Sequence, residues 1–419
     1  MTPFGLLFLL LLLAGTGLRL WLSWRHIAHV RANRSQVPEP FAPQIDLGAH
    51  QKAADYSVAK SRLNSVGLVI DAIVLLAFTL GGGFRALNDV AQALFEGGIA
   101  SGVVFVAGVG IVTSLVELPF NVYRVFVLEA RFGFNKMTPG MFVGDLLKQT
   151  LVAVVLGLPL VLAVLWLMQA MGAFWWLWVW GVWVGFSVVM LAVYPTFIAP
   201  LFNKFSPMED GDLRRRIEAL LQKCGFRSQG LFVMDGSRRS SHGNAYFTGF
   251  GKAKRIVFFD TLLNRLDPGE IEAVLAHELG HFKLNHVFRR MAWTFAAGLA
   301  FLWALGMLRN AAWFFDGVNA PFPASDAVAL VVFFMVVPVF TFPFRPLIAM
   351  YSRKHESEAD AYAARNASPA DLAQALVKLY KDNASTLTPD PLHSAFYDSH
   401  PPASARIARL KHFSGASAS

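Results

Sequence analysis

Only one cysteine, Cys224, occurs among the 419 residues, so the chain cannot form an intrachain disulfide. Any zinc site must therefore take its ligands from histidines and carboxylates rather than from thiolates. Charged residues are also scarce: they make up 16% of the chain, whereas soluble proteins carry about 25%. The sequence contains no nucleic-acid-binding motif, internal repeat or low-complexity tract. We therefore interpret the net charge of +9 as basic cytoplasmic loops of a membrane protein, without a nucleic-acid partner.

Hydrophobic residues, by contrast, make up 55% of the chain and are gathered into long runs. Each run is near the roughly 20 residues that cross a bilayer as a helix. The seven runs are 4–24, 66–84, 97–120, 149–170, 174–198, 287–308 and 327–350. The second is the weakest, because it is short and contains Asp71. The first lacks a preceding basic segment and a small-residue cleavage site, so we expect a retained helix.

Basic residues alternate from loop to loop along these runs. Lys and Arg are frequent after the first, third, fifth and seventh runs, whereas the loops after the second and sixth contain one arginine each, Arg85 and Arg309. The positive-inside rule then places the N-terminus outside and the C-terminus in the cytoplasm. We expect five transmembrane helices in 1–200, two more in 287–350, and cytoplasmic segments 201–286 and 351–419.

The two cytoplasmic segments predict one small α+β domain interrupted by a helical hairpin. Hydrophobic spacing predicts a helix over Asp212–Cys224. Strands are expected at Leu231–Met234, Asn244–Phe247 and Arg255–Phe259. A further helix starts at Ser368 and runs to about Lys381. The chain as a whole is predicted to be mainly α-helical.

The first cytoplasmic segment ends with His277-Glu278-Leu279-Gly280-His281, which matches the pattern H-E-x-x-H. Asp267, Pro268 and Glu270 form a strong helix start before it. Histidines four residues apart lie on one helix face and can bind the same zinc ion, and Glu278 can take a proton from a zinc-bound water. The alternative is a surface helix with two ordinary histidines.

A catalytic zinc site needs a third protein ligand. The position six residues after His281 is Val287, and His286 is on another face of the helix, so we expect His286 to be a polar surface residue. Glu356 and Asp360 are spaced by four on a predicted helix, with Glu358 pointing the opposite way. Glu356 could bind the metal while Asp360 accepts a hydrogen bond from a ligand histidine. Equally, these acids could form a solvated helix face.

Several segments resemble the type I CAAX prenyl endopeptidases, which are integral-membrane gluzincin zinc metalloproteases, and we expect a bacterial relative. The similarity covers nearly the whole chain. Besides the H-E-x-x-H helix it includes 51–53 with Tyr56, 129–135, 198–203, 244–247, 352–360, and His400-Pro401-Pro402 with Arg406.

The resemblance implies that His277, His281 and Glu356 bind one zinc ion per chain and that Glu278 is the general base. It also implies that His400 and Arg406 lie near the site and assist substrate or oxyanion binding, although His400 alone reads as an ordinary loop histidine. The seven helices are further expected to enclose a water-filled chamber, which we expect the intramembrane acids Asp71 and Glu117 to line rather than pair with a helix-end arginine or backbone.

The strand that contains Asn244, Ala245 and Tyr246 looks like an edge strand, which would hold an extended peptide substrate by strand addition. The equally weighted alternative is an ordinary core hairpin.

These features predict a membrane zinc endopeptidase that processes C-terminal CAAX-type peptides, with peptides or prenylated proteins as substrates. One alternative is a membrane-protein quality-control protease of broad specificity. Another is a non-enzymatic membrane protein with structural zinc, which an intact general base and only three apparent ligands disfavour. The C-terminus shows no ER retrieval sequence, so we expect the bacterial inner membrane.

Overall fold

The structure of the chain, a computed structural model, describes residues 1–226, 230–248 and 255–416. Within these residues seven helical segments are long and apolar enough to cross a membrane, as the sequence predicts. They are built on α1 (Pro3–Ala32), α2 (Leu47–Phe78), α4 (Gly98–Tyr123), α5 (Pro139–Ala170), α6 (Trp175–Val193), α11 (His286–Leu308) and α13 (Asp326–Thr341).

Three of these helices continue past their membrane-spanning part. They continue as η1 (Arg124–Glu129) after α4, as η3 (Tyr194–Ile198) and α7 (Ala199–Phe202) after α6, and as η5 (Phe342–Phe344) and α14 (Arg345–Asn366) after α13. A short turn, η2 (Gly172–Phe174), precedes α6. The helices therefore extend beyond the apolar runs, because the hydrogen bonds of a helix do not stop where its hydrophobic residues do.

The predicted second span, 66–84, is wrong at its end. Helix α2 stops at Phe78, and the chain turns through Gly81 and Gly82 before α3 (Gly83–Leu94) begins. Gly82 has a φ of 81°, which a residue with a side chain rarely adopts. At its other end α2 begins at Leu47, where the Asp46 side chain accepts a hydrogen bond from the backbone of Ala49.

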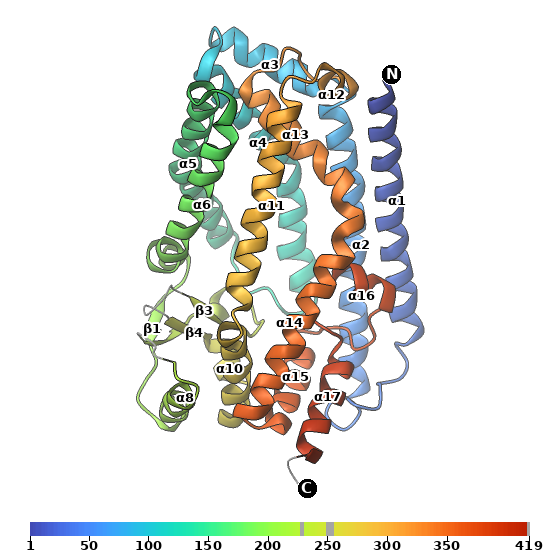
Figure 1. Ribbon diagram of the computed structural model, residues 1–419. Coiled ribbons are helices and arrows are strands. Elements are labelled where there is room, and N and C mark those ends of the chain that lie inside the picture. The colour runs from blue at the N-terminus through green and yellow to red at the C-terminus, as the bar shows by residue number, and fades with distance from the viewer. Residues whose placement is uncertain (227–229, 249–254, 417–419) are drawn as a thin grey trace.

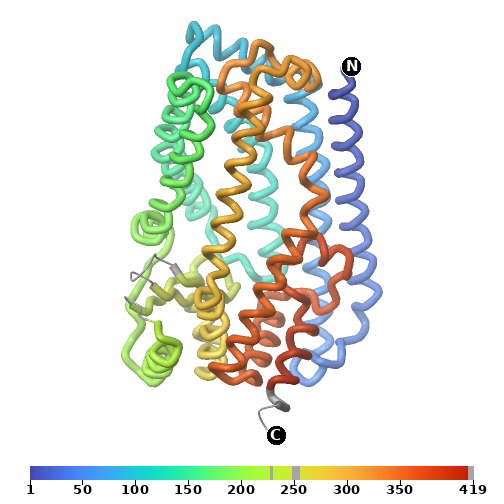
Figure 2. Tube along the Cα trace, viewed as in Figure 1, coloured from blue at the N-terminus to red at the C-terminus, as the bar shows by residue number. Residues whose placement is uncertain are grey.

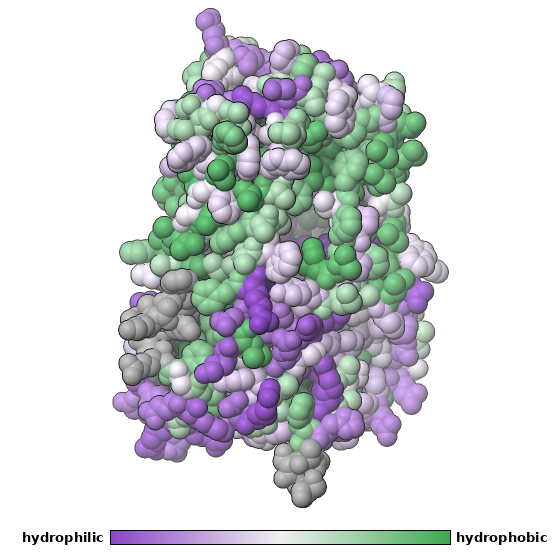
Figure 3. Space-filling model, in the orientation of Figure 1, coloured by the Kyte–Doolittle hydropathy of each residue, from purple (hydrophilic) through white to green (hydrophobic). Residues whose placement is uncertain are grey.

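The helices form a bundle with distinct ends (Figures 1 and 2). The N-terminus, α3 and α12 (Ala312–Gly317) lie at one end, and the sheet, α8 and the C-terminus lie at the other. On the visible face the helical bundle is mainly apolar, whereas the end with the sheet and α8 is hydrophilic (Figure 3). This distribution fits a bundle embedded in lipid with one polar domain beyond the bilayer.

The sheet has the strand order β1-β2-β4-β3. Its strands are β1 (Phe205–Pro207), β2 (Leu231–Met234), β3 (Ala245–Thr248) and β4 (Arg255–Phe259). Strands β2 and β4 pair in parallel and have the bounds predicted from the sequence, while β3 pairs antiparallel with β4. The expected strand at 244–247 is shifted by one residue, and it lies at an edge of the sheet as expected.

Segments from both sides of the α11–α14 hairpin pack into one core beneath the bundle. Ile271 and Leu279 of the first segment and Ala363, Leu372 and Leu376 of the second belong to the same buried cluster. The remaining elements of this domain are α8 (Asp212–Lys223), η4 (Gly236–Arg238), α9 (Asp260–Leu263), α10 (Pro268–Lys283), α15 (Pro369–Asp382), α16 (Pro391–Tyr397) and α17 (Ala403–Ala416). The domain is therefore assembled from two segments, as the sequence predicts.

Candidate active site

Helix α10 presents two histidines on the face that packs against α14. Its start is fixed as the sequence predicts: the Asp267 and Glu270 side chains form a capping box, and Pro268 is the first helical residue. His277 and His281 follow one turn apart. Because the first residue of α10 is fixed and the helix is regular, both imidazoles point toward α14.

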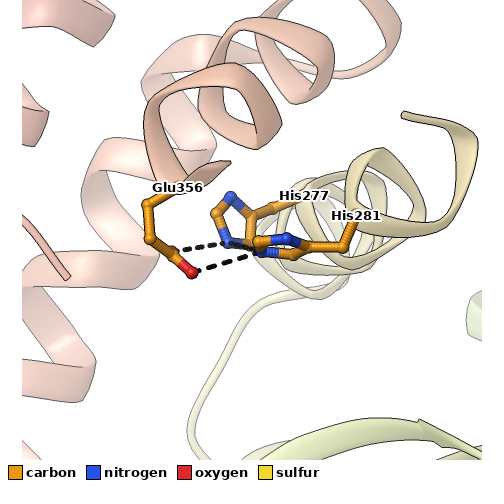
Figure 4. Close-up of side chains that lie close together, drawn as sticks. All are labelled: His277, His281 and Glu356. Atoms are coloured by element: carbon orange, nitrogen blue, oxygen red, sulfur yellow. Dashed lines mark hydrogen bonds and ion pairs between the residues drawn. The ribbon is translucent and has the colours of Figure 1, made fainter. Parts of the chain in front are cut away.

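Glu356 of α14 meets these two histidines (Figure 4). Its carboxylate oxygens lie 3.3 Å from His277 Nε2 and 3.4 Å from His281 Nε2, and the two Nε2 atoms are 3.3 Å apart. The three ligand atoms all lie within 4.8 Å of one another. The structure thus brings together the three residues that we expect from the sequence to be metal ligands.

A glycine permits this close approach of the two helices. A Cβ atom at Gly280 would lie 3.1 Å from both Ala359 Cα and Tyr362 Cβ, which is closer than ordinary van der Waals contact. Since Ala359 is only three residues after Glu356, a larger residue at 280 would push the carboxylate away from the histidines.

The donor set fits a divalent cation such as zinc. Two imidazole nitrogens and one carboxylate oxygen converge, and zinc is commonly bound by His and Glu in catalytic sites with a fourth position open. Glu356 is buried, and its Oε2 atom makes no hydrogen bond to the described residues. A buried carboxylate oxygen without a hydrogen-bond partner is costly, and a cation would satisfy it.

On the far side of His277, Asp360 and Arg406 form a buried ion pair. Asp360 Oδ1 lies 2.9 Å from His277 Nδ1, and the Arg406 guanidinium donates two hydrogen bonds of 2.6 and 2.9 Å to the same carboxylate. Burial by itself lowers the pKa of His277, but the carboxylates of Asp360 and Glu356 outweigh it and raise the pKa to about 9. The second nitrogen of this imidazole is therefore held by a fixed acceptor.

On the far side of His281 the prediction for His286 is wrong. His286 is buried rather than on the surface, its Nδ1 lies 3.1 Å from His281 Nδ1, and its Nε2 lies 2.9 Å from Glu358. The cause is Asn285, whose φ of 59° breaks the helix between α10 and α11 and turns His286 back toward His281. An uninterrupted helix would have pointed this side chain elsewhere.

His286, Glu358 and His355 also bring possible ligand atoms together within 4.8 Å. The His286 and His355 rings are stacked, however, with centroids 4.1 Å apart and planes at 6°. The nitrogen lone pairs of parallel stacked rings do not converge on one ion. We therefore interpret this group as a hydrogen-bonded and stacked support for His281 and not as a second metal centre.

A cavity of about 1540 Å³ extends from the helical bundle to residues that border the metal-ligand cluster. His400 and Arg406 line it, and His400 Nε2 lies 3.4 Å from Glu356 Oε2. Asp71 and Glu117 line the same cavity, in agreement with the expectation that these intramembrane acids face a chamber. Polar residues of α1, α2 and α4 also contribute to its walls, so the cavity extends into the membrane-spanning part.

The edge strand β3 begins beside this cavity. Asn244 is exposed and lines the cavity, and the next residues, Ala245 and Tyr246, pair with Phe258 and Val257 of β4. The other edge of β3 has no paired strand among the described residues. An extended peptide could therefore add to this edge.

Two family matches account for most of the chain. Residues 26–204 match the CAAX prenyl protease N-terminal family with its five membrane helices, and residues 207–414 match peptidase family M48. The chain belongs to the CAAX prenyl protease family of M48 peptidases. This family membership indicates an integral-membrane zinc metalloendopeptidase, so the predicted family and enzyme class are confirmed and the non-enzymatic alternative is wrong.

Individual CAAX prenyl proteases agree with this assignment over nearly their full length. The chain is 38% identical to a CAAX prenyl protease 1 homolog of Arabidopsis thaliana, covering 88% of this chain and 89% of the relative. It is 32% identical to CAAX prenyl protease 1 of Saccharomyces cerevisiae, covering 94% and 92%. The crystal structure of S. mikatae Ste24p matches with a TM-score of 0.89 at 30% identity, covering 98% of this chain and 99% of that one.

Some contacts around this CAAX prenyl protease site were not predicted from the sequence. Besides His286, the most important is Arg353, which donates hydrogen bonds from Nη1 to the backbone oxygens of Ser394 and Asp398. These bonds tie the segment before His400 to helix α14. The family resemblance includes residues 352–360, but no local sequence pattern predicts that Arg353 contacts Ser394, which is 41 residues further along the chain.

Proposed function

We propose that this chain is a zinc endopeptidase of CAAX type, which hydrolyses a peptide bond near the C-terminus of a prenylated protein. The observation that carries the proposal is the convergence of His277, His281 and Glu356, with Glu278 next to His277 on α10, beside a large cavity that His400 and Arg406 line. The relatives named above are CAAX prenyl proteases, which supports the substrate class.

His277, His281 and Glu356 would hold the zinc ion through Nε2, Nε2 and a carboxylate oxygen. Bound zinc would lower the pKa of a water molecule and polarise the peptide carbonyl. Asp360 and His286 occupy the remaining nitrogens of the two imidazoles, so that each ring has one orientation and presents Nε2 to the ion.

Glu278 is the general base in this proposal. It removes a proton from the attacking water and delivers it to the leaving amine. Burial raises the pKa of Glu278, although the neighbouring histidines oppose the shift. A carboxylate with a raised pKa is a stronger base, which suits this role.

His400 and Arg406 differ in what they can contribute. His400 is 56% exposed to the cavity and close to Glu356, so its ring can donate a hydrogen bond to the oxyanion that forms on the substrate. Arg406 donates two hydrogen bonds to Asp360, and its Nη2 atom also lies 3.5 Å from His277 Nδ1, so we assign it mainly to positioning His277. The family resemblance implies that both residues assist substrate or oxyanion binding, whereas we propose that role for His400 alone.

The substrate would enter through the cavity and add to strand β3 at Asn244, Ala245 and Tyr246. Pockets for drug-sized ligands are roughly 300–1,000 Å³. The cavity exceeds that range, so it has room for a peptide and an attached lipid chain. The cavity walls contain both polar and apolar residues and are equally compatible with unmodified peptides. The property to test is therefore whether cleavage depends on the lipid chain.

The test compares one peptide in farnesylated and unmodified forms, cleaved by purified protein in detergent. Glu278→Gln should keep zinc and lose about 10²–10⁴ in turnover, because general base catalysis contributes that much. Glu272→Gln is the matched control, since its carboxylate lies on the same helix and pairs with Arg216 at the surface. Equal cleavage of both peptides would favour a broad quality-control protease, and normal turnover by Glu278→Gln would refute the mechanism.

We also propose that the sheet end of the molecule is cytoplasmic and the α3 end is outside, following the basic loops. The test replaces Cys224 and introduces a cysteine at Asp89 or Glu209, both exposed. In spheroplasts an impermeant maleimide should label the cysteine at 89 and spare that at 209. The reverse pattern would invert the topology. The bacterial inner membrane stays a prediction.

A further inference from the structure

Two arginines of the cavity wall have no ionic partner. Arg19 of α1 and Arg345 at the start of α14 both line the cavity, and no carboxylate of the described residues lies within the 4.0 Å of an ion pair. The Arg19 Nε atom is buried and lacks a hydrogen-bond partner. A charged residue within a membrane-spanning helix is expensive, and one without a partner indicates a functional role.

Both guanidinium groups lie over the faces of aromatic rings. Arg19 Cζ lies 4.1 Å from the centroid of Phe342, and Arg345 Cζ lies 4.8 Å from that of Tyr397. A ring face attracts the positive charge but accepts few of the five N–H donors of a guanidinium, so donors remain for another partner. These donors match a carboxylate, which accepts paired hydrogen bonds from arginine.

The charges of the cavity lining leave a small positive excess. The lining contains six arginines and lysines and three carboxylates. Two of the arginines, Arg239 and Arg406, are neutralised by Asp145 and Asp360, so four cations remain beside three carboxylates. Arg19 lies within electrostatic range of both Arg345 and the carboxylate of Asp71, so an anion placed between the two arginines would still meet a net positive charge.

The distance from these arginines to the metal ligands fits a short peptide. Arg345 precedes Glu356 by eleven residues of one helix, which corresponds to about 16 Å along its axis. Tyr397, whose ring lies under the Arg345 guanidinium, is only three residues before His400, so the Cα atoms of Tyr397 and His400 are at most about 11 Å apart. Three extended residues of a substrate likewise span about 10 Å. The Arg345 side chain covers the difference between the length of about 16 Å along the helix and the length of about 10 Å of the peptide.

We propose that Arg19 and Arg345 form a subsite for the free C-terminal carboxylate of the peptide substrate. The subsite would set the distance between the substrate's C-terminus and the bond that is cleaved. This inference rests on the proposed function, because it takes the cluster of His277, His281 and Glu356 as the cleavage site.

The experiment measures binding separately from cleavage. A fluorescent peptide is prepared with either a free C-terminal carboxylate or a C-terminal amide, and both are titrated against zinc-loaded Glu278→Gln protein. We expect the acid to bind at least tenfold more tightly. Arg345→Gln and Arg19→Gln should each reduce this ratio toward one, whereas Arg345→Lys should recover part of it, because lysine keeps the charge but not the paired donors.

Arg124→Gln is the matched control, because Arg124 is another arginine of the same cavity without an ion pair among the described residues. Its acid-to-amide ratio should stay that of the parent protein. Equal binding of acid and amide, or loss of the preference only in Arg124→Gln, would overturn the proposed subsite. Cleavage by the wild-type protein tests the proposed function independently: efficient cleavage with equal binding of both peptides would reject the subsite and leave the endopeptidase intact.

Discussion

The ion pair between Arg406 and Asp360 offers the sharpest test of how the metal site is supported. Both side chains are almost completely buried, with 7% and 3% exposed, and together they hold His277 by its Nδ1 atom. The informative substitution is Arg406→Leu, which keeps much of the side-chain volume and removes the charge and both hydrogen bonds.

The expected losses follow from the burial of the pair. Removing one partner of a buried ion pair costs about 3–5 kcal/mol, because the other charge is left without compensation. The free energy of unfolding should fall by that amount. Zinc affinity should fall by about 10–100-fold, the usual effect of losing a group that orients a ligand histidine. Since the Arg406 charge lowers the pKa of His277, its removal also makes the proton there harder for zinc to displace.

Zinc affinity is measured by competition with a chelator, and stability by thermal unfolding in detergent. Arg409→Leu, on the same helix and without an ion pair among the described residues, is the control and should change neither quantity. Adding Asp360→Asn to Arg406→Leu should restore part of the lost stability, because it removes the unpaired charge. If Arg406→Leu binds zinc as the wild type does, or if the two losses simply add, the pair does not support the site.

Other predictions concern the ligands themselves. Because metal binding must displace the proton that His277 holds with a pKa of about 9, apparent zinc affinity should rise by up to about tenfold per pH unit from pH 7 to pH 9 and then level off; a flat profile in chelator competition would contradict this. Glu356→Ala should lose zinc in elemental analysis, and full occupancy would move the third ligand elsewhere. His286→Leu should weaken zinc binding about 10–100-fold, and His286→Asn, which keeps an acceptor near Nδ1, should recover part of it; equal effects of the two variants would exclude the hydrogen bond to His281.

The sequence was sufficient wherever the signal is local. The capping residues around Pro268 set the start of α10, so the direction of His277 and His281 followed from helical spacing alone. Strands β2 and β4 had the predicted bounds because continuous apolar residues lie between polar turns. The seven membrane helices were predictable for the same reason, since a hydrophobic run is a property of consecutive residues.

The sequence was insufficient where one residue redirects the chain or where contacts are distant. Asn285 adopts a left-handed conformation that helical periodicity does not reveal, and the position of His286 depends entirely on it. The turn after Phe78 likewise ends a helix inside an apolar run. The pairing of Arg353 with the backbone near Ser394 depends on tertiary packing, and Glu356 was equally compatible with a solvated helix face until α14 was placed against α10.

Both ligand helices are joined directly to membrane-spanning helices, and this has a consequence for catalysis. Helix α10 is followed after two residues by α11, and α14 continues from α13 through a single turn. The distance between the histidines and Glu356 is therefore fixed by the packing of α10 against α14, which Gly280 makes possible, and the height of the site is fixed by the bundle. A cleavage site attached in this way remains at a constant depth below the bilayer. A substrate anchored in the membrane by a lipid chain then meets the same geometry at every encounter, whereas a freely diffusing peptide must be oriented by the cavity wall itself.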